Sequence, residues 1–234
     1  MKRKLVSIYY SMSLFLNYCL AMVLGKNFTR VNSASNYQPL PWIGLNNARR
    51  AKGTIDRWES MKNVLEPNSS VLDIGCDVGY FVFKAAEKGC LAWGMDDNLY
   101  SNLIANYAKH KIGLLNSQFF LQRIDINNIN LLPEFDYIIL LSVFHHWSKE
   151  YGFEKAKGML SILIRKSKKG LFFEMGQSEM SSEYNIPKVD GDFETWLKNF
   201  LGSISNKKIT SLGKFQTFVD KGKKRAERSM IFIS

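Results

Sequence analysis

Cysteine is scarce in this sequence, which has three in 234 residues: Cys19, Cys76 and Cys90. An odd number without a short metal-type spacing predicts neither a disulfide framework nor a zinc site, and it fits a reducing, cytoplasmic setting. Histidine is equally scarce. His145 and His146 are adjacent, but His110 lies far from them in the sequence, so we expect no metal bound by histidine.

Acidic residues are also in the minority, with 21 Asp and Glu against 32 Lys and Arg, which gives a net charge of +11. The basic excess lies at the two ends of the sequence: residues 1–57 carry +8 and residues 165–234 carry +6, whereas residues 58–164 carry −3. This distribution suits a partner with phosphate groups, such as anionic lipid, nucleic acid or a phosphorylated metabolite. It is equally typical of solvated surface lysines.

Charged residues are absent from residues 5–24, and basic residues lie on both sides of this run: Lys2, Arg3, Lys4, Lys26 and Arg30. A helix of this length is long enough to cross a bilayer. Three interpretations remain open. The run is a cleaved signal peptide, a helix inserted in or lying against a membrane, or a helix packed on its own domain or on a second subunit.

Proline is rare, and two of the five prolines, Pro39 and Pro41, lie in an Asn- and Ser-rich segment that we expect to be a connector over residues 26–53. From residue 54 to 234 strand and helix patterns alternate as one domain, and Thr54 is the expected N-cap of a helix over 54–66. Hydrophobic residues make up 46% of the chain, which excludes global disorder.

The expected strands cover residues 71–74, 90–95, 118–124, 135–142, 170–174, 215–219 and 230–233, with a charged loop over 220–229. The other expected helices cover residues 79–88, 99–111, 152–165 and 192–203. This alternation predicts βαβ units and a mostly parallel sheet.

A glycine-rich turn follows the first expected strand, in the sequence VLDIGCDVGYF of residues 71–81. Gly75 and Gly79 let the backbone approach a ligand, and the helix after them points free N–H groups at the same place. Asp73 adds a carboxylate near the end of the strand. Asp96 and Asp97 end the next strand, where βαβ domains place the acceptor for ribose hydroxyls. The alternative is that the glycines serve only tight turns and close packing.

This motif resembles the first motif of class I S-adenosylmethionine-dependent methyltransferases, except that Asp77 stands where the family has its middle glycine. The resemblance covers residues 54–176 well and implies an α/β Rossmann-like, doubly wound, mostly parallel sheet of seven strands, with the last strand antiparallel, in a methyltransferase domain over residues 54–234. The uncharged run predicts a hydrophobic N-terminal helix over residues 1–25 ahead of this domain. It also implies S-adenosylmethionine as the cofactor. A dinucleotide-binding dehydrogenase would instead prefer the spacing Gly-x-Gly-x-x-Gly.

The resemblance further implies the residues that bind the methyl donor. Asp96 is the expected ribose ligand, Asp125 is the acid expected beside the adenine, and Ile126 is its apolar cover. The full expected set is Asp73, Gly75, Cys76, Asp77, Gly79, Asp96, Asp97, Asp125, Ile126 and Ser142.

Three side chains are candidates for the chemistry of transfer. His145 and His146 directly follow the strand over 135–142, and a histidine near neutral pH can accept a proton from a hydroxyl or amine. We expect at least one of them to face the site and favour His145, the alternative being that both cap the next helix. Glu174 ends the strand over 170–174, where it either positions a substrate or pairs with an arginine, namely Arg49, Arg50 or Arg57.

The expected function is methyl transfer to O or N of a small-molecule, saccharide or lipid-linked acceptor. The resemblance implies this acceptor class, because similar loops occur in bacterial methyltransferases encoded beside glycan genes. Two alternatives stay open: a nucleic-acid (RNA) methyltransferase, favoured by the charge alone, and a non-catalytic donor-binding protein. The sequence LSVF at 141–144 stands where base N-methyltransferases have Asn/Asp-Pro-Pro-Tyr. The expected location is the cytoplasm, with attachment to the cytoplasmic face of a membrane through residues 5–24 as one interpretation.

Overall fold

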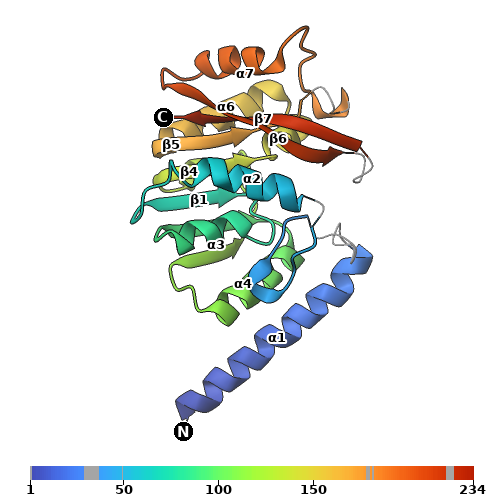
Figure 1. Cartoon of the computed structure of the whole chain (residues 1–234), viewed down its shortest axis with the longest axis vertical. Coiled ribbons are helices and arrows are strands. Elements are labelled where there is room, and N and C mark those ends of the chain that lie inside the picture. Colours follow the sequence, from blue (N-terminus) through green and yellow to red (C-terminus); the bar gives the residue numbers. More distant parts are fainter. Residues whose placement is uncertain (1, 29–36, 49, 178–179, 181, 220–223) are drawn as a thin grey trace.

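A seven-stranded sheet forms the centre of the computed structural model, which describes residues 2–28, 37–48, 50–177, 180, 182–219 and 224–234 (Figure 1). The strands are β1 (Ser70–Ile74), β2 (Leu91–Asp96), β3 (Ser117–Leu121), β4 (Phe135–Leu141), β5 (Ser167–Glu174), β6 (Ile209–Val219) and β7 (Lys224–Ile233). Their order in the sheet is β3-β2-β1-β4-β5-β7-β6, and β7 runs antiparallel to both of its neighbours. The predicted fold class is therefore confirmed: a doubly wound Rossmann-like sheet whose last strand is antiparallel.

Helices cover both faces of this sheet. They are α2 (Ala51–Met61), α3 (Tyr80–Glu87), α4 (Leu99–Ile112), α5 (Phe144–Tyr151), α6 (Phe153–Lys166) and α7 (Phe193–Gly202), and α1 (Lys2–Phe28) lies outside α4 (Figure 1). Successive strand residues point to opposite faces. Val71 and Phe172 accordingly pack in one core with α2, α3 and α4, while Leu72 and Phe173 pack in the other with α5, α6 and α7.

Several element boundaries differ from the predicted ones. Helix α2 begins at Ala51 with Arg50 at its cap position, so Thr54 lies inside the helix and is buried, and its assignment as the N-cap is wrong. Helix α5 directly follows β4 and was not among the predicted helices. Gly152, with φ of 85°, separates α5 from α6. The predicted helix over 152–165 corresponds to α6, whereas α5 was missed because residues 144–151 were interpreted as a loop beyond the strand.

The last two strands are longer than predicted. Strand β6 begins at Ile209, and the charged residues 224–229, expected as a loop, belong to β7. Residues 220–223 of that expected loop lie outside the described residues. Continuous pairing of β6 with β7 gives these polar residues their extended conformation, for example Lys214 opposite Ser229 and Gln216 opposite Glu227. Backbone pairing thus overrides the low strand propensity of charged side chains.

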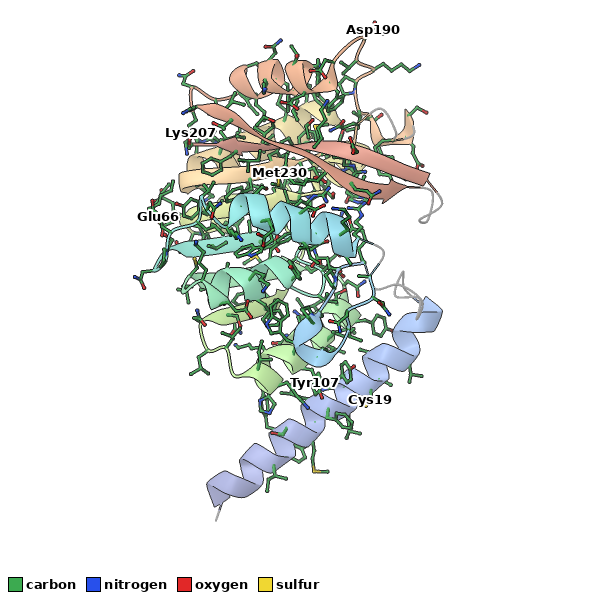
Figure 2. All side chains as sticks on the ribbon, viewed as in Figure 1. Cys19, Glu66, Tyr107, Asp190, Lys207 and Met230 are labelled. Carbon is green, nitrogen blue, oxygen red and sulfur yellow. The ribbon has the colours of Figure 1, made fainter. Side chains whose placement is uncertain are left out.

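Helix α1 packs against α4 through one side. Tyr18 stacks on Tyr107 with ring centroids 4.2 Å apart, and Ser11 Oγ lies 2.8 Å from His110 Nε2; Figure 2 labels Tyr107 beside Cys19 at this contact. The exposed apolar side chains of α1 include Ile8, Tyr9, Met12, Phe15, Leu16, Leu20 and Val23. In the described part of the chain, no helix combines the length and apolar character needed to cross a membrane. Packing on the chain's own domain, the third interpretation of residues 5–24, therefore holds for one side of α1.

Candidate functional site

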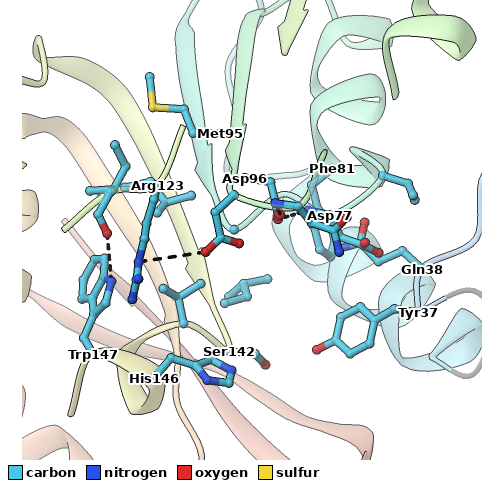
Figure 3. Close-up of a pocket in the computed structure, with 18 of the residues that line it drawn as sticks. Tyr37, Gln38, Asp77, Phe81, Met95, Asp96, Arg123, Ser142, His146 and Trp147 are labelled. Atoms are coloured by element: carbon cyan, nitrogen blue, oxygen red, sulfur yellow. Dashed lines mark hydrogen bonds and ion pairs between the residues drawn. The ribbon is translucent and has the colours of Figure 1, made fainter. Parts of the chain in front are cut away.

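A cavity of about 750 Å³ opens at the carboxyl ends of β1, β2 and β4 (Figure 3). Strands β1 and β4 are neighbours at the point where the strand order reverses, which is where open α/β sheets bind their ligands. The residues that line the cavity include Tyr37, Gln38, Arg50, Arg57, Gly75, Asp77, Met95, Asp96, Asp97, Arg123, Ile124, Ser142, His146, Trp147, Lys149 and Tyr184.

The glycine-rich turn after β1 forms part of this lining. Gly75 and Gly79 have φ of 74° and 87°, a region that side chains other than glycine rarely adopt. A Cβ on Gly75 would lie 2.5 Å from Val143 Cγ2, and a Cβ on Gly79 would lie 2.2 Å from the Phe119 ring. Gly75 lines the cavity, whereas Gly79 starts α3 and packs on Phe119. Both glycines are therefore required by conformation and by space.

Asp96, at the end of β2, is fixed by the backbone around it. Its Oδ2 accepts a hydrogen bond of 2.7 Å from the Asp77 N–H, and its Oδ1 accepts one of 2.8 Å from the Asn98 N–H. Asp77 has φ of 50° in the turn, and its Oδ1 accepts a bond of 2.8 Å from the Ser101 hydroxyl. Both carboxylates line the cavity, as the sequence predicts for Asp96 and Asp77.

Asp73, Asp77 and Asp96 form a cluster of three carboxyl groups. Burial raises the pKa of all three; Asp96 and Asp77 raise the pKa of Asp73 further, and Asp96 helps to raise the pKa of Asp77 to about 6. The Oδ2 atoms of Asp73 and Asp77 are buried and have no hydrogen-bond partner in the described part of the chain. Unsatisfied buried carboxylate oxygens favour a ligand that brings cationic groups and hydroxyls.

S-adenosylmethionine meets this requirement with its ammonium group, its sulfonium and its two ribose hydroxyls, and these two positive charges outweigh its single carboxylate. A dinucleotide fits poorly, because its doubly negative pyrophosphate would approach the glycine turn beside these carboxyl groups. This electrostatic argument is independent of the glycine spacing and points the same way.

Two further predicted donor residues have clear places. Cys76 is buried, and a Cβ on Gly94 would lie 2.7 Å from its Sγ, so Cys76 packs under the turn and is not among the residues that line the cavity. Burial raises the pKa of its thiol well above the usual value. Asp97 lines the cavity with an exposed side chain, and its Oδ2 lies 3.9 Å from Arg123 Nε.

The structure does not bring Asp125 and Ile126 to the cavity. Asp125 Oδ1 accepts hydrogen bonds from the N–H groups of Asn127 and Asn128, and Ile126 is exposed. Gln122, Arg123 and Ile124 line the cavity instead. The reason is that β3 ends at Leu121, three residues earlier than predicted, so an earlier part of the loop passes the cavity.

The two histidines at the start of α5 differ in environment. His145 is 4% exposed, and its Nδ1 accepts a hydrogen bond of 3.1 Å from the Gly176 N–H, whereas His146 is exposed and lines the cavity. Their rings lie 4.4 Å apart, both beside Tyr184. The sequence favoured His145, but the structure places His146 at the cavity.

Glu174 pairs with an arginine, one of the two roles that the sequence left open. Arg57 Nε and Nη2 each lie 2.7 Å from Glu174 Oε2, and Ser142 Oγ donates to Glu174 Oε1 at 3.0 Å. The carboxylate is fully buried and is not among the residues that line the cavity. Arg57, one of the candidate partners, forms this pair, and the candidate Arg49 lies outside the described residues.

Ser142 lies at the centre of a polar cluster at the end of β4. Its φ of 63° is unusual for a residue other than glycine. Its hydroxyl accepts hydrogen bonds from Arg50 Nη1 at 3.3 Å and Arg228 Nη1 at 3.0 Å. Ser142 lines the cavity, and Figure 3 shows it near His146. Strained backbone of this kind is often found at functional sites.

Sequence reasoning missed Tyr37, Gln38 and Arg228. Tyr37 and Gln38 come from the segment expected as a connector, where Gln38 Oε1 accepts a hydrogen bond from the Tyr80 N–H at 3.2 Å. The apolar residues that follow them were the available signal: Leu40 is fully buried and the Trp42 ring packs 5.0 Å from Phe83. Arg228 carried no local signal, because its segment reads as an exposed charged loop.

Comparison with known proteins gives matches among solved structures. No protein-family model matches the sequence, and no curated protein matches it. The bifunctional kinase-methyltransferase WbdD is similar with a TM-score of 0.65 and 22% identity, over 86% of this chain and 44% of WbdD. The chain thus spans less than half the length of WbdD.

Two shorter proteins are similar over most of their own length. Magnesium protoporphyrin IX methyltransferase ChlM from Synechocystis PCC 6803, solved with bound S-adenosylmethionine, has a TM-score of 0.53 and 18% identity over 79% of this chain and 78% of ChlM. An S-adenosylmethionine-dependent methyltransferase from Aquifex aeolicus has a TM-score of 0.50 and 15% identity over 82% and 95% of the two chains. The chain has the fold of S-adenosylmethionine-dependent methyltransferases.

Proposed function

We propose that this protein is an S-adenosylmethionine-dependent methyltransferase that acts on O or N of a small-molecule, saccharide or lipid-linked acceptor. The observation that supports this most is the pair of carboxyl groups of Asp77 and Asp96, which line the cavity beside the glycine turn, since Asp77 Oδ2 is buried and lacks a hydrogen-bond partner in the described part of the chain. Asp73 is buried behind them and is not among the residues that line the cavity. The fold and the position of the cavity at the switch point agree with this proposal.

In this proposal each part of the donor has a place in the cavity. Asp96 accepts the ribose hydroxyls, and Asp77 with the Gly75 turn receives the ammonium end. Met95 and Ile124 supply apolar surface for the adenine. The bound donor supplies a methyl group activated by the positive sulfonium.

The protein's own contribution to transfer is alignment and proton removal. Methyl transfer is a displacement that depends on the placement of donor and acceptor. His146 lines the cavity with an exposed ring, so it accepts the proton of an acceptor hydroxyl or amine. Glu174 instead holds Arg57 and Ser142 in place, because both of its oxygens already accept hydrogen bonds from them.

Calorimetry with S-adenosylmethionine and S-adenosylhomocysteine tests this proposal. We expect both to bind and NAD to fail to bind. A cell extract supplied with isotope-labelled methyl donor and the purified protein then yields a labelled product, which mass spectrometry identifies. Absence of donor binding contradicts the proposal. Binding without any labelled product would support the alternative of a non-catalytic donor-binding protein.

We also propose that α1 attaches the protein to an anionic membrane surface. The side of α1 opposite α4 carries Ile8, Met12, Leu16 and Leu20 with exposed fractions of 51–63%. Lysines and arginines lie at both ends of the helix, and no charged residue lies between them. An apolar face with basic ends is the pattern of a helix that lies in the interface plane of a bilayer with negative headgroups.

Vesicle sedimentation tests this attachment. We expect the full chain to sediment with vesicles of phosphatidylcholine and phosphatidylglycerol and less with phosphatidylcholine alone. The double variant Leu16→Ser/Leu20→Ser loses this binding. The control Leu115→Ser/Leu131→Ser, which changes leucines that are 91% and 82% exposed elsewhere on the surface, keeps it. The proposal fails if the parent protein stays in solution. It also fails if light scattering shows that the parent is a dimer and that Leu16→Ser/Leu20→Ser disrupts this dimer.

A further inference from the structure

Arg123 follows β3 and reaches two other elements at the cavity. Its Nη2–H donates to Glu150 Oε2 of α5, and its Nε lies 3.9 Å from the Oδ2 of Asp97, the residue after β2. All three residues line the cavity, and in the view of Figure 3 Arg123 lies between Trp147 and Asp96. The Arg123 side chain therefore links the loop after β3 to the end of β2 and to α5.

The backbone on both sides of Arg123 is fixed as well. The Asp96 carbonyl oxygen accepts a hydrogen bond of 2.9 Å from the Gln122 N–H. The Ile124 carbonyl oxygen accepts one of 3.1 Å from Trp147 Nε1, which lies in α5. Arg123 thus has a fixed backbone and, at its tip, two carboxylate partners, so its guanidinium is oriented before any ligand binds.

The faces of this guanidinium can receive a planar group. The N–H bonds of a guanidinium lie in its plane, so the hydrogen bond to Glu150 uses an edge and leaves the faces open. The Arg123 side chain is 48% exposed, so the protein covers only about half of it. Guanidinium planes stack on aromatic rings and on nucleobases. Adenine is the planar aromatic group of S-adenosylmethionine.

The order of the strands places Arg123 at the adenine end of the donor. The turns after β1, β2 and β3 follow one another along the sheet edge, because these strands are neighbours. In the proposed function, Asp77 after β1 receives the ammonium end and Asp96 at the end of β2 accepts the ribose hydroxyls. The ribose carries the adenine and the amino acid part on opposite sides. The adenine therefore lies toward the loop after β3, where Arg123 and Ile124 line the cavity.

We propose that Arg123 stacks on the adenine of the methyl donor, with Asp97 and Glu150 holding its guanidinium in position. The proposal rests on the proposed function, because it assigns one more residue to the same donor. The charge of Arg123 does not repel the positively charged donor, since two carboxylates lie beside it. Arg123 then contributes to donor affinity through the adenine, and a ligand without adenine gains nothing from it.

Ligands that carry or lack adenine test this contact without a known acceptor. S-adenosylhomocysteine and methylthioadenosine carry it, whereas S-ribosylhomocysteine is the first ligand without its adenine. We expect Arg123→Gln to weaken the first two by about the same factor, about 5- to 30-fold, as loss of a cation–π contact predicts. The affinity for S-ribosylhomocysteine should stay within about twofold. Calorimetry measures the tight ligands and NMR titration the weak ones.

The NMR spectrum of the parent protein gives a direct signature of stacking. The Arg123 Nε–H resonance should move upfield when methylthioadenosine binds, because a proton above the face of a purine is shielded by the ring current. S-ribosylhomocysteine should not cause this upfield shift.

Three further variants make the outcome decisive. Arg123→Lys keeps the charge without the planar face, and its affinities should lie closer to those of Arg123→Gln than to those of the parent. Glu150→Gln loosens the guanidinium and should weaken the adenine ligands by a smaller factor. The control Lys149→Gln removes a charge from another side chain that lines the cavity and pairs with Glu183, and all affinities should stay within about twofold.

The proposal is overturned if Arg123→Gln binds S-adenosylhomocysteine and methylthioadenosine as tightly as the parent does. It is also overturned if Lys149→Gln weakens them as much, or if S-ribosylhomocysteine loses affinity by the same factor, since the effect is then not specific to adenine. In these outcomes the parent still binds S-adenosylhomocysteine, so the proposed function stands. If the parent binds none of the three ligands, the proposed function itself fails, and the stacking proposal fails with it.

Discussion

Arg57 and Glu174 form an ion pair in the protein interior, with Arg57 Nη2 2.7 Å from Glu174 Oε2 and side-chain exposures of 5% and 0%. The pair joins α2 to the carboxyl end of β5, so it fixes the helix that follows Arg50. Breaking a buried pair by removing one partner leaves an uncompensated charge, which is more costly than the loss of a surface pair.

We therefore expect Glu174→Gln to lower the free energy of unfolding by about 3–5 kcal/mol, measured by urea denaturation at pH 7. The control Glu66→Gln, which breaks an exposed pair with Lys169, should change it by less than about 1 kcal/mol. Similar effects in the two variants would show that the buried pair is not a main determinant of stability.

Asp77 makes stability depend on pH. Its pKa is about 6 in the folded chain against 3.8 normally, mainly because of burial and the charge of Asp96. Below about pH 3 the Asp77 carboxyl is neutral in both the folded and the unfolded chain. As the pH rises to 6, Asp77 ionises in the unfolded chain but keeps its proton in the folded chain. The free energy of unfolding therefore falls. Asp77→Asn should abolish this loss.

The expected gain of Asp77→Asn at pH 7 is up to about 3 kcal/mol and vanishes at about pH 3. The asparagine oxygen can still accept the bond from Ser101. Urea denaturation at both pH values measures the effect, and the exposed Asp97→Asn serves as the control. An equal gain at both pH values would contradict the electrostatic explanation.

Donor affinity should depend on Asp96 and not on Asp125. Asp96→Ala removes an acceptor at the cavity, and we expect S-adenosylhomocysteine to bind about 10- to 100-fold more weakly in calorimetry. Asp125→Ala removes a carboxylate that binds the N–H groups of its own loop, and the affinity should stay within about threefold. A larger loss of affinity in Asp125→Ala would support the position beside the adenine that the sequence predicts for Asp125.

The two histidines should separate catalysis from stability. With an acceptor from the labelling experiment, His146→Ala should lower turnover about 10²- to 10⁴-fold and leave donor affinity unchanged. His145→Ala should lower the free energy of unfolding by about 1–3 kcal/mol, because the Gly176 N–H then lacks its partner. If His146→Ala keeps near-parental turnover and pH profile, the alignment of donor and acceptor alone accounts for the transfer.

Gly53 should tolerate no side chain. A Cβ there would lie 2.1 Å from the Gln216 carbonyl oxygen and 2.8 Å from Arg57 Nη1, so Gly53→Ala forces α2 away from β6 and should destabilise the protein by about 1–3 kcal/mol. Gly158, in α6, has no atom within 4 Å of the added Cβ. Gly158→Ala should therefore stabilise by about 0.5–1 kcal/mol. Thermal unfolding compares the two, and equal effects would contradict close contact at Gly53.

Local sequence signals predicted the residues that line the cavity after β1 and β2, because these residues follow one another along the chain. The turn with Gly75 and Gly79, and Asp96 at the end of the next strand, are fixed by one βαβ unit. Asp125 was assigned by analogy, and a difference of three residues in the end of β3 moved it away from the cavity. Strand ends depend on pairing and loop packing, which local patterns do not specify.

The arginine contacts around Ser142 and Glu174 could not be predicted from local sequence patterns in the same way. Arg50 and Arg57 were candidate partners of Glu174, but the choice between them depends on how closely α2 approaches β6 at Gly53. Arg228 reaches Ser142 because β7 lies between β5 and β6. These contacts join residues 86 or more positions apart and are decided by tertiary structure.

The position of β7 also sets the order in which the protein can assemble during synthesis. Residues 224–233 form an interior strand between β5 and β6, and Arg228 completes the cluster at Ser142. A nascent chain emerges from its amino end, so the βαβ unit from β1 to β2 can fold while the later residues are still being translated. The cluster at Ser142 stays incomplete until β7 has left the ribosome, and a ribosome-stalled chain ending before residue 224 would have the glycine turn and Asp96 in place without Arg228 at Ser142.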